Sequence, residues 1–295
     1  MQILSAPIQE YTDAAFRNAH SRMIGGVDEY YLPFLRLEHG ELPKRAMMDC
    51  AAENNRCPHA VAQLLARTAS EVEILRDHLV GQGYRRLDLN LGCPFPKVVK
   101  GGYGAGMLSC PEGIREVLTA LCASSELRIS VKMRLGVSSE TEWREVLPIL
   151  NDLPLEKIVL HPRTAEMQYD GAPNREQWLR FQKECRHPVI YNGDIRCVAD
   201  ADGLDGVMAG RGLLADPLLP LRLRGDTPST AMLASFHDAY CEECCRLYQQ
   251  PLLKLKLLWE YFLPDAERRL RKAIQKAKTL EEYRMAVSCL LETLA

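Results

Sequence analysis

Residues 128–164, RISVKMRLGVSSETEWREVLPILNDLPLEKIVLHPRT, contain two short apolar segments separated by a longer amphipathic one. The apolar segments predict strands at Arg128–Met133 and Lys157–His161, and the spacing of apolar residues between them predicts a helix over Glu140–Asp152. Two strands joined by such a crossover run parallel in one sheet. This stretch is therefore a βαβ unit, and it indicates an α/β fold.

The same alternation extends from residue 1 to about residue 225. Short apolar segments predict eight strands, at Gln2–Pro7, Glu29–Leu32, Ala60–Leu64, Arg86–Asn90, Arg128–Met133, Lys157–His161, Val189–Asn192 and Gly206–Met208. Amphipathic segments predict further helices over Ala69–Gln82, Pro111–Ser124 and Asn174–Glu184. Eight consecutive βα units are typical of a (β/α)8 TIM barrel.

Two departures from this repeat define the domain organisation. Only RCVADADGLDG separates Ile195 from Val207, so we expect the seventh barrel helix to be vestigial. After LRLRGDTPST, residues 221–230, the strand pattern stops, and helices are expected over Ser229–Gln250, Leu252–Phe262, Asp265–Lys278 and Leu280–Leu294. We therefore expect a catalytic barrel over residues 1–225 and a C-terminal helical domain over residues 226–295.

Composition excludes several classes of protein. The first residues, MQILSAPIQEYTD, do not resemble a signal peptide, and the chain contains no apolar run long enough to span a membrane. We expect a cytoplasmic monomer with no membrane partner, in which most of the eleven cysteines are buried thiols. The net charge of −2 provides no general attraction to nucleic acid, so an RNA partner would require a local basic surface.

The residues at the ends of the predicted strands are unusually polar. Active sites of (β/α)8 barrels lie at the carboxyl ends of the strands. Here those positions include Glu29, Gln63, Asn90 with Cys93, Lys132 with Arg134, His161 with Arg163, Asn192-Gly193-Asp194 and Gly210-Arg211. Cations beside glycine-rich turns at one barrel mouth indicate a ligand that carries a phosphate group.

The segment LNLGCPFPKVVKGGYGAGML, residues 89–108, resembles the signature of the tRNA-dihydrouridine synthases, in which a cysteine follows an Asn–x–Gly pattern after the fourth strand. Further similarity covers SAPIQEYTDAAFR (5–17), VAQLL (61–65), SVKMRLG (130–136), LHPRTAEMQYDG (160–171), YNGDI (191–195) and VMAGRGLLADP (207–217). The resemblance implies bound FMN, NADPH as reductant, and a helical domain that grips tRNA, with rRNA as an alternative partner.

The resemblance also implies a role for individual residues. The cofactor would be held by Ala6, Pro7, Ile8, Gln63, Lys132, His161, Asn192, Gly193, Asp194, Gly210 and Arg211. The substrate would be contacted by Asn90, Glu29 and Arg163. The sequence departs from the family pattern where Glu10 replaces a glycine of the first loop and Ile8 replaces a methionine.

Cys93 is the predicted catalytic acid. Reduction of the C5–C6 double bond of uracil requires hydride at one carbon and a proton at the other. A thiol with an ordinary pKa near 8.5 is largely protonated at neutral pH and can donate that proton.

Three other groups of residues have both a functional and a structural interpretation. Cys241, Cys244 and Cys245 form a C-x2-C-C cluster inside a predicted helix, and we interpret them as packed thiols and expect no metal site. The helical domain concentrates positive charge at Lys254, Lys256, Arg268, Arg269, Arg271, Lys272, Lys276 and Lys278, either as a solvated face or as a phosphate-binding surface. Aromatic residues that stack an extruded base or simply pack are Tyr30, Phe34, Phe95, Tyr103 and Tyr169.

Two competing functions remain open at this stage. A flavin-dependent dehydrogenase of a free pyrimidine, of the dihydroorotate or dihydropyrimidine type, would use the same barrel but would not need a basic appendage. A non-catalytic RNA-binding barrel would not need Cys93, Asn90, Lys132 and His161 together.

Overall fold

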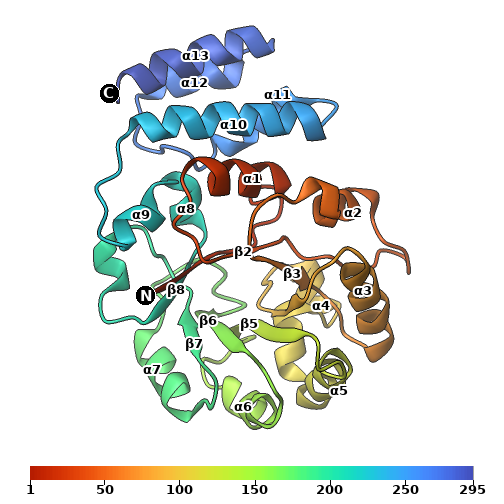
Figure 1. Cartoon of the computed structure of the whole chain (residues 1–295). Coiled ribbons are helices and arrows are strands. Elements are labelled where there is room, and N and C mark those ends of the chain that lie inside the picture. The colour runs from red at the N-terminus through yellow and green to blue at the C-terminus, as the bar shows by residue number, and fades with distance from the viewer. Residues whose placement is uncertain (295) are drawn as a thin grey trace.

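The eight predicted strands form a closed barrel in which each strand pairs in parallel with its neighbours in chain order. The computed structural model describes residues 1–294 (Figure 1). The strands are β1 (Gln2–Ser5), β2 (Glu29–Tyr31), β3 (Ala60–Leu64), β4 (Arg86–Leu91), β5 (Arg128–Gly136), β6 (Lys157–Thr164), β7 (Val189–Tyr191) and β8 (Gly206–Ala209). The predicted (β/α)8 barrel is confirmed: β3 has its expected bounds, and the other strands differ from theirs by at most three residues at the carboxyl end.

The barrel is surrounded by helices whose apolar faces pack on the strands. The predicted helices correspond to α3 (Ala69–Gly81), α5 (Pro111–Leu121), α6 (Trp143–Asp152) and α7 (Arg175–Glu184). The chain also forms α1 (Ala14–Met23), α2 (Lys44–Cys50), α4 (Pro96–Lys100), α8 (Arg211–Ala215) and α9 (Leu219–Leu223), which were not predicted. The seventh crossover contains only a single 3-10 turn, Val198–Ala201, as expected from its length.

The C-terminal helices lie on one side of the barrel, as a layered stack over α1 (Figure 1). They are α10 (Ala231–Leu247), α11 (Pro251–Leu258), α12 (Arg268–Lys276) and α13 (Leu280–Glu292). The proposed boundary at residue 225 falls between α9 and α10. The stack nevertheless shares a core with the barrel, because Phe236 of α10 packs edge-to-face on Phe16 of α1 with ring centroids 5.7 Å apart.

Two further observations concern the whole described chain. None of the helices within residues 1–294 combines the length and the apolar composition needed to cross a membrane. Because all eight strands are parallel, their carboxyl ends meet at one mouth of the barrel, and the loops that follow them surround a common site.

Candidate active site

A pocket opens at the carboxyl ends of β1, β5, β6, β7 and β8. It is lined by Ala6, Pro7, Ile8, Lys132, His161, Tyr169, Asn192, Gly193, Asp194, Ile195, Arg196, Met208, Gly210, Arg211 and Gly212. Every residue predicted to hold the cofactor is therefore part of this pocket, except Gln63. The structure brings together residues that are more than 200 positions apart in the sequence.

One end of this pocket has the composition of an anion site. Asp194, whose φ of 48° is left-handed, accepts hydrogen bonds from Arg163 and from Arg211, the latter at 2.6 Å. Burial alone would raise the pKa of Asp194, but the two guanidinium groups lower it below its usual value. The Arg163 side chain is almost fully buried, whereas Arg211 keeps 32% exposure. Arg211, unlike Arg163, therefore remains accessible to a ligand.

Two glycines keep this end of the pocket open. A Cβ atom on Gly210 would lie 3.2 Å from Cδ1 of Ile8, and one on Gly193 would lie 3.0 Å from Pro173 Cβ. Both distances are tighter than ordinary van der Waals contact. Side chains at these positions would therefore narrow a space that has the donors and the cation required by a phosphate group.

Lys132 and His161 both line the pocket, and the pKa of each is lowered. Burial, reinforced by Arg134, lowers the pKa of Lys132 to about 8. Burial and the surrounding cations also hold the pKa of His161 well below its usual value, so the imidazole is neutral at pH 7. Arg163 Nη1 donates to His161 Nε2 at 3.0 Å. Since a guanidinium can only donate, His161 carries its proton on Nδ1.

A chain of side-chain hydrogen bonds runs inside the barrel toward Cys93. Gln63 Nε2 donates to Asp88 Oδ2 at 2.7 Å, and Asn90 Nδ2 donates to Gln63 Oε1 at 2.8 Å. Asn90 Oδ1 in turn accepts the backbone N–H of Cys93 at 2.9 Å. Asp88 therefore orients Gln63, which orients Asn90, which fixes the loop that carries Cys93.

Asp88 was missed in the sequence, although a signal for it was present. Asp88 and Asn90 are two positions apart on β4, so both side chains point into the barrel. Ser130 Oγ also donates to Asp88 Oδ1 at 2.6 Å. Complete burial raises the pKa of Asp88 to about 6, because these hydrogen bonds and Lys132 offset only part of the desolvation.

Cys93 sits in a small apolar cluster at the end of β4. Its neighbours are Leu65 and Val98, with Phe34 and Tyr103 packed against them, and only 7% of Cys93 is exposed. Burial raises the pKa of the thiol, and this effect outweighs the opposing influence of Lys132 and Arg134. The geometry therefore keeps Cys93 protonated at neutral pH, as an acid requires.

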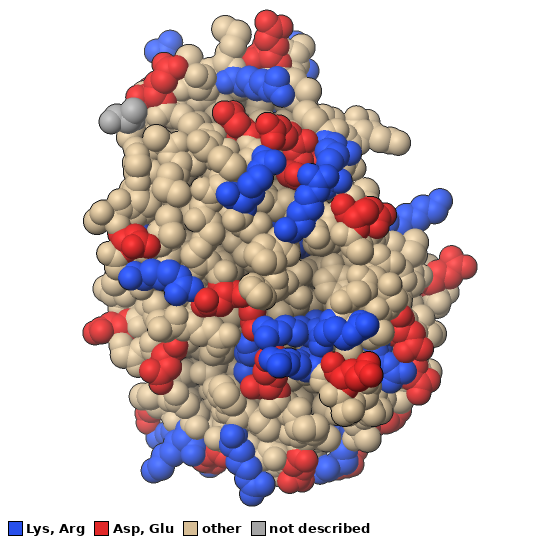
Figure 2. Space-filling model, viewed as in Figure 1, with Lys and Arg blue, Asp and Glu red and all other residues tan. Residues whose placement is uncertain are grey.

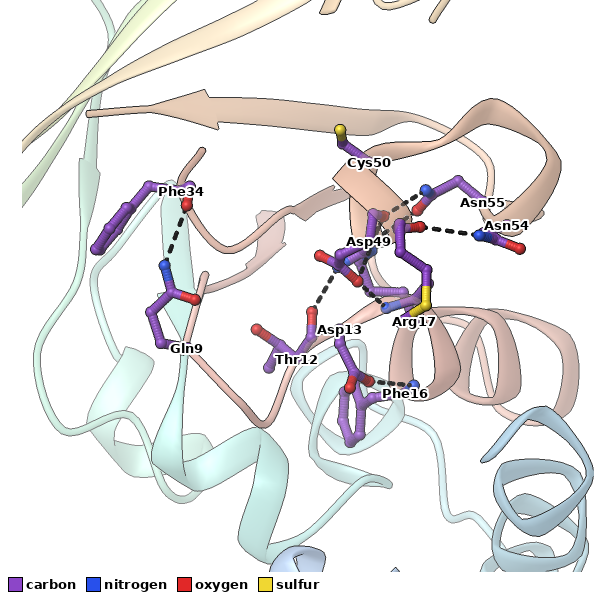
Figure 3. Close-up of polar contacts among 12 residues, drawn as sticks. Gln9, Thr12, Asp13, Phe16, Arg17, Phe34, Asp49, Cys50, Asn54 and Asn55 are labelled. Atoms are coloured by element: carbon purple, nitrogen blue, oxygen red, sulfur yellow. Dashed lines mark hydrogen bonds and ion pairs between the residues drawn. The ribbon is translucent and has the colours of Figure 1, made fainter. Parts of the chain in front are cut away.

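The loop between β1 and α1, which contributes Ala6 and Ile8 to the pocket, is held by Thr12 and Arg17 (Figure 3). Thr12 Oγ1 accepts the Ile8 backbone N–H at 2.7 Å and donates to the Ala6 carbonyl at 3.1 Å. The fully buried Arg17 donates to the Thr12 carbonyl at 2.7 Å and pairs with Asp49 of α2 at 3.3 Å. This network fixes one wall of the pocket.

Comparison with known proteins identifies the family. The family model described as "Dihydrouridine synthase (Dus)" matches residues 4–288. The chain belongs to the dihydrouridine synthase family. It is therefore an oxidoreductase of this family, and the resemblance noted from its sequence is confirmed.

Individual relatives agree with this assignment. "tRNA-dihydrouridine(16) synthase" of Ralstonia nicotianae is 31% identical over 246 residues, which cover 76% of this chain and 73% of that protein. "Probable tRNA-dihydrouridine synthase 2" of Bacillus subtilis is 27% identical over 302 residues, which cover 95% of this chain and 90% of that protein. A solved structure of a variant of NCR from Zymomonas mobilis superposes with a TM-score of 0.51 at 13% identity, over 81% of this chain and 92% of that one, and shares the barrel fold alone.

Within this dihydrouridine synthase, one of the three predicted substrate contacts lies away from the mouth of the barrel. Glu29 is the first residue of β2, and it pairs with Lys157, the first residue of β6, at 2.7 Å and with Arg86, the first residue of β4. These positions lie at the amino ends of the strands, so Glu29 faces the opposite end of the barrel from Cys93. Arg163 lies at the mouth, where its buried guanidinium donates to His161 and Asp194, and its contact with a substrate stays a prediction.

The helical domain contacts the β1–α1 loop through Lys254, one of the basic residues interpreted as either a solvated face or a phosphate-binding surface. Lys254 of α11 is buried, pairs with Asp13 at 2.6 Å and donates to the Glu10 carbonyl. Tyr248 also donates to Asp13. Glu10 has a φ of 74°, a left-handed conformation that glycine adopts without strain, and its carbonyl is the one that Lys254 contacts.

The other candidate basic residues fall into two groups. Lys256 donates to the Ala277 carbonyl, and Arg271 donates to the carbonyls of Trp259, Phe262 and Leu263, so both tie the helical domain together. The residues whose side chains remain exposed are Arg268, Arg269, Lys272, Lys276 and Lys278. Only this exposed group is available to bind a partner.

The aromatic and cysteine candidates also separate by burial. Tyr30 is 1% exposed and hydrogen-bonds His20 at 2.7 Å, so it packs rather than stacks a ligand. Phe95 and Tyr169 are 57% and 48% exposed, and both lie at the barrel mouth. Cys241 and Cys244 are buried and Cys245 is exposed. Across residues 1–294, no group of three or more His, Cys, Asp or Glu side chains is arranged to hold a metal ion.

Proposed function

We propose that this enzyme reduces uridine in tRNA to 5,6-dihydrouridine, with FMN as the bound flavin and NADPH as the reductant. The observation that carries the proposal is the placement of the buried Cys93 thiol, whose pKa is raised by burial, at the mouth that also contains the anion site. The relatives named above, which are tRNA-dihydrouridine synthases, support the same substrate.

The residues that line the pocket support a flavin mononucleotide as the ligand. Arg211, with Asn192 and the backbone around Gly193 and Gly210, would hold the phosphate and the ribityl chain, because an accessible cation and an open cradle lie together there. Lys132 and His161 would bind the polar edge of the ring system. The chemistry that FMN supplies when bound is hydride transfer to C6 of the uracil.

The residues of the chain itself would manage the proton. Asn90 and Cys93 face the base, and Cys93 gives the proton on Sγ to C5 as the C5–C6 double bond is reduced. The hydrogen bond from the Cys93 backbone to Asn90 keeps the thiol in position. The raised pKa keeps the proton on sulfur until that step.

The exposed basic residues of α12 and the segment after it would bind the RNA backbone, despite the net charge of −2. Figure 2 shows that Lys and Arg side chains lie over the C-terminal helices and gather again near the middle of the same face, with acidic side chains between them. Local groups of cations are sufficient to bind phosphates.

The proposal is tested by mapping dihydrouridine. Mass spectrometry of tRNA and rRNA from a deletion strain should reveal one or more tRNA uridines that are no longer reduced, and the wild-type gene should restore them. Loss of dihydrouridine from rRNA instead would change the substrate class. No change in either RNA, together with reduction of a free pyrimidine by the purified protein, would contradict the proposal and favour a free-pyrimidine dehydrogenase.

The cofactor is tested separately. Protein denatured after purification should release FMN, identified by chromatography against FMN and FAD standards. Release of FAD, or failure to bind either flavin on reconstitution, would contradict the cofactor assignment.

A further inference from the structure

A second cleft opens beside the site described above and is not used by the proposed chemistry. Its volume is about 520 Å³, within the range of ligand-binding pockets. It lies among the loops that follow β1, β2 and β4. Its walls include Gln9, Phe34, Arg36, Phe95, Lys97 and Val98.

The cleft is continuous with the surroundings of Cys93. Phe34 and Val98 both line the cleft and pack in the apolar cluster around Cys93. Gln9 Nε2 donates to the Phe34 carbonyl at 3.1 Å, which ties the loop after β1 to the loop after β2 (Figure 3). A ligand that extends outward from a base held at Cys93 would therefore meet this cleft first.

Phe95 provides an apolar surface without a covering group. It follows Cys93 by two positions, forms the N-cap position of α4, and remains 57% exposed. The partly buried ring of Phe34 lines the same cleft. Aromatic rings placed along a groove are typical stacking platforms for single-stranded nucleic acid.

Lys97 provides the cation that such a ligand requires. Arg36 pairs with Glu38 at 2.8 Å and Arg45 pairs with Glu10 at 2.8 Å, both on the cleft wall. The deeper acids Asp13 and Asp49 are likewise paired, with Lys254 and Arg17. Among the ion pairs formed within residues 1–294, none involves the exposed Lys97. A stacking ring and an unpaired ammonium group beside it match one base and one phosphate.

We propose that this cleft binds the nucleotide next to the reacting uridine, with its base against Phe95 and its phosphate at Lys97. The inference rests on the proposed function, because it requires an RNA whose uridine is presented to Cys93. It extends that function by assigning a second nucleotide subsite, which would hold the RNA chain open while the uridine is inserted.

The test uses an RNA stem–loop with a single loop uridine, together with versions that lack the base on its 5′ or its 3′ side. For the wild-type enzyme, loss of one of the two neighbouring bases should weaken binding by roughly 5- to 150-fold, the range found when a stacking aromatic side chain is replaced by alanine. Phe95→Ala should weaken binding of the intact RNA by a similar factor. Phe95→Ala should bind the RNA that lacks this neighbouring base no more weakly than it binds the intact RNA. Phe95→Tyr should bind the intact RNA as tightly as the wild-type enzyme does.

Control variants separate this subsite from general effects. Leu179→Ala removes an equally exposed apolar side chain from α7 and should leave all affinities unchanged. Lys97→Gln should reduce the slope of log affinity against log salt by about 0.7, the value for one phosphate contact with a single strand. Lys183→Gln, on α7, should not change the slope.

The outcomes distinguish the two levels of the proposal. If wild-type enzyme binds the stem–loop and Phe95→Ala binds it equally well, or if the losses from Phe95→Ala and the abasic site add, the subsite is refuted and the proposed function stands. If wild-type enzyme binds none of these RNAs and no natural tRNA either, the proposed function fails, and the subsite fails with it.

Discussion

Replacement of Lys254 by methionine should destabilise the protein by removing the contact between the helical domain and the wall of the active site. Methionine has a similar length but no charge, so the change removes the ion pair with Asp13 while leaving most of the packing. The side chains of Lys254 and Asp13 are only 5% and 7% exposed, so the carboxylate left behind cannot be solvated by water. Loss of one partner of a buried pair typically costs about 3–5 kcal/mol.

Two features of the structure adjust this magnitude. Tyr248 still donates to Asp13 in the variant, which retains part of the stabilisation of the carboxylate. The Glu10 carbonyl, however, loses its donor as well, and Glu10 already has a left-handed backbone. We therefore expect the free energy of unfolding to fall by about 3 kcal/mol.

The measurement is urea-induced unfolding followed by circular dichroism. Lys278→Met, which removes an exposed lysine from the same helical domain, is the control and should change the stability by less than about 0.5 kcal/mol. Asp13→Asn removes the charge of the same ion pair but retains a side chain that can cap α1. Because each single variant already breaks this pair, the free energy of unfolding of the double variant should fall by less than the sum of the two single losses. A loss below about 1 kcal/mol for Lys254→Met, or strictly additive losses, would refute this reasoning.

Three further predictions concern the pocket, its wall and the RNA surface. The affinity for FMN should fall as the pH rises through about 8, because Lys132 is charged below that value and neutral above it. In Lys132→Arg, a titration measured by flavin fluorescence should show this fall only at higher pH. An unchanged midpoint would contradict the assignment. Glu10→Gly should be more stable than Glu10→Ala by about 1 kcal/mol in urea unfolding, because only glycine adopts a φ of 74° without strain. Equal stabilities of the two variants would show that the loop relaxes. Combined charge reversal of Arg268, Arg269 and Lys272 should weaken tRNA binding and reduce its salt dependence in filter-binding assays, whereas an unchanged slope would place the RNA elsewhere.

The strands and most of the pocket could be predicted because both depend on local pattern. Short apolar segments define the strands, and in a parallel barrel the residues that end them must meet at one mouth, which is why Lys132, His161 and Asp194 were placed together correctly. Glu29 was misplaced because it begins the predicted strand Glu29–Leu32 and also the observed β2, and a residue that begins a strand lies at its amino end. The rule was sound, but Glu29 was wrongly counted among the residues that end a strand.

Burial of charged residues could not be predicted in the same way. Lys254 and Arg271 appear in the sequence among many basic residues of amphipathic helices, and their neighbours there do not show which side chains turn inward. Lys254 is buried because α11 packs close to the β1–α1 loop, a contact between segments more than 240 positions apart. Asp88 was overlooked for a different reason, since an acidic residue inside an apolar strand becomes meaningful only when its partners Ser130 and Gln63 are known.

The central claim is that Cys93 donates a proton to the uracil while other residues hold the flavin and the RNA. Cys93→Ala enzyme, reduced with NADPH and mixed with tRNA that lacks dihydrouridine, tests this claim in a single turnover followed by flavin absorbance. The variant should retain FMN, its reduction by NADPH and its tRNA affinity, while the oxidation of the reduced enzyme by tRNA slows by about 10²–10⁴-fold, the usual contribution of a positioned acid. Oxidation by tRNA at the wild-type rate in Cys93→Ala would contradict the account.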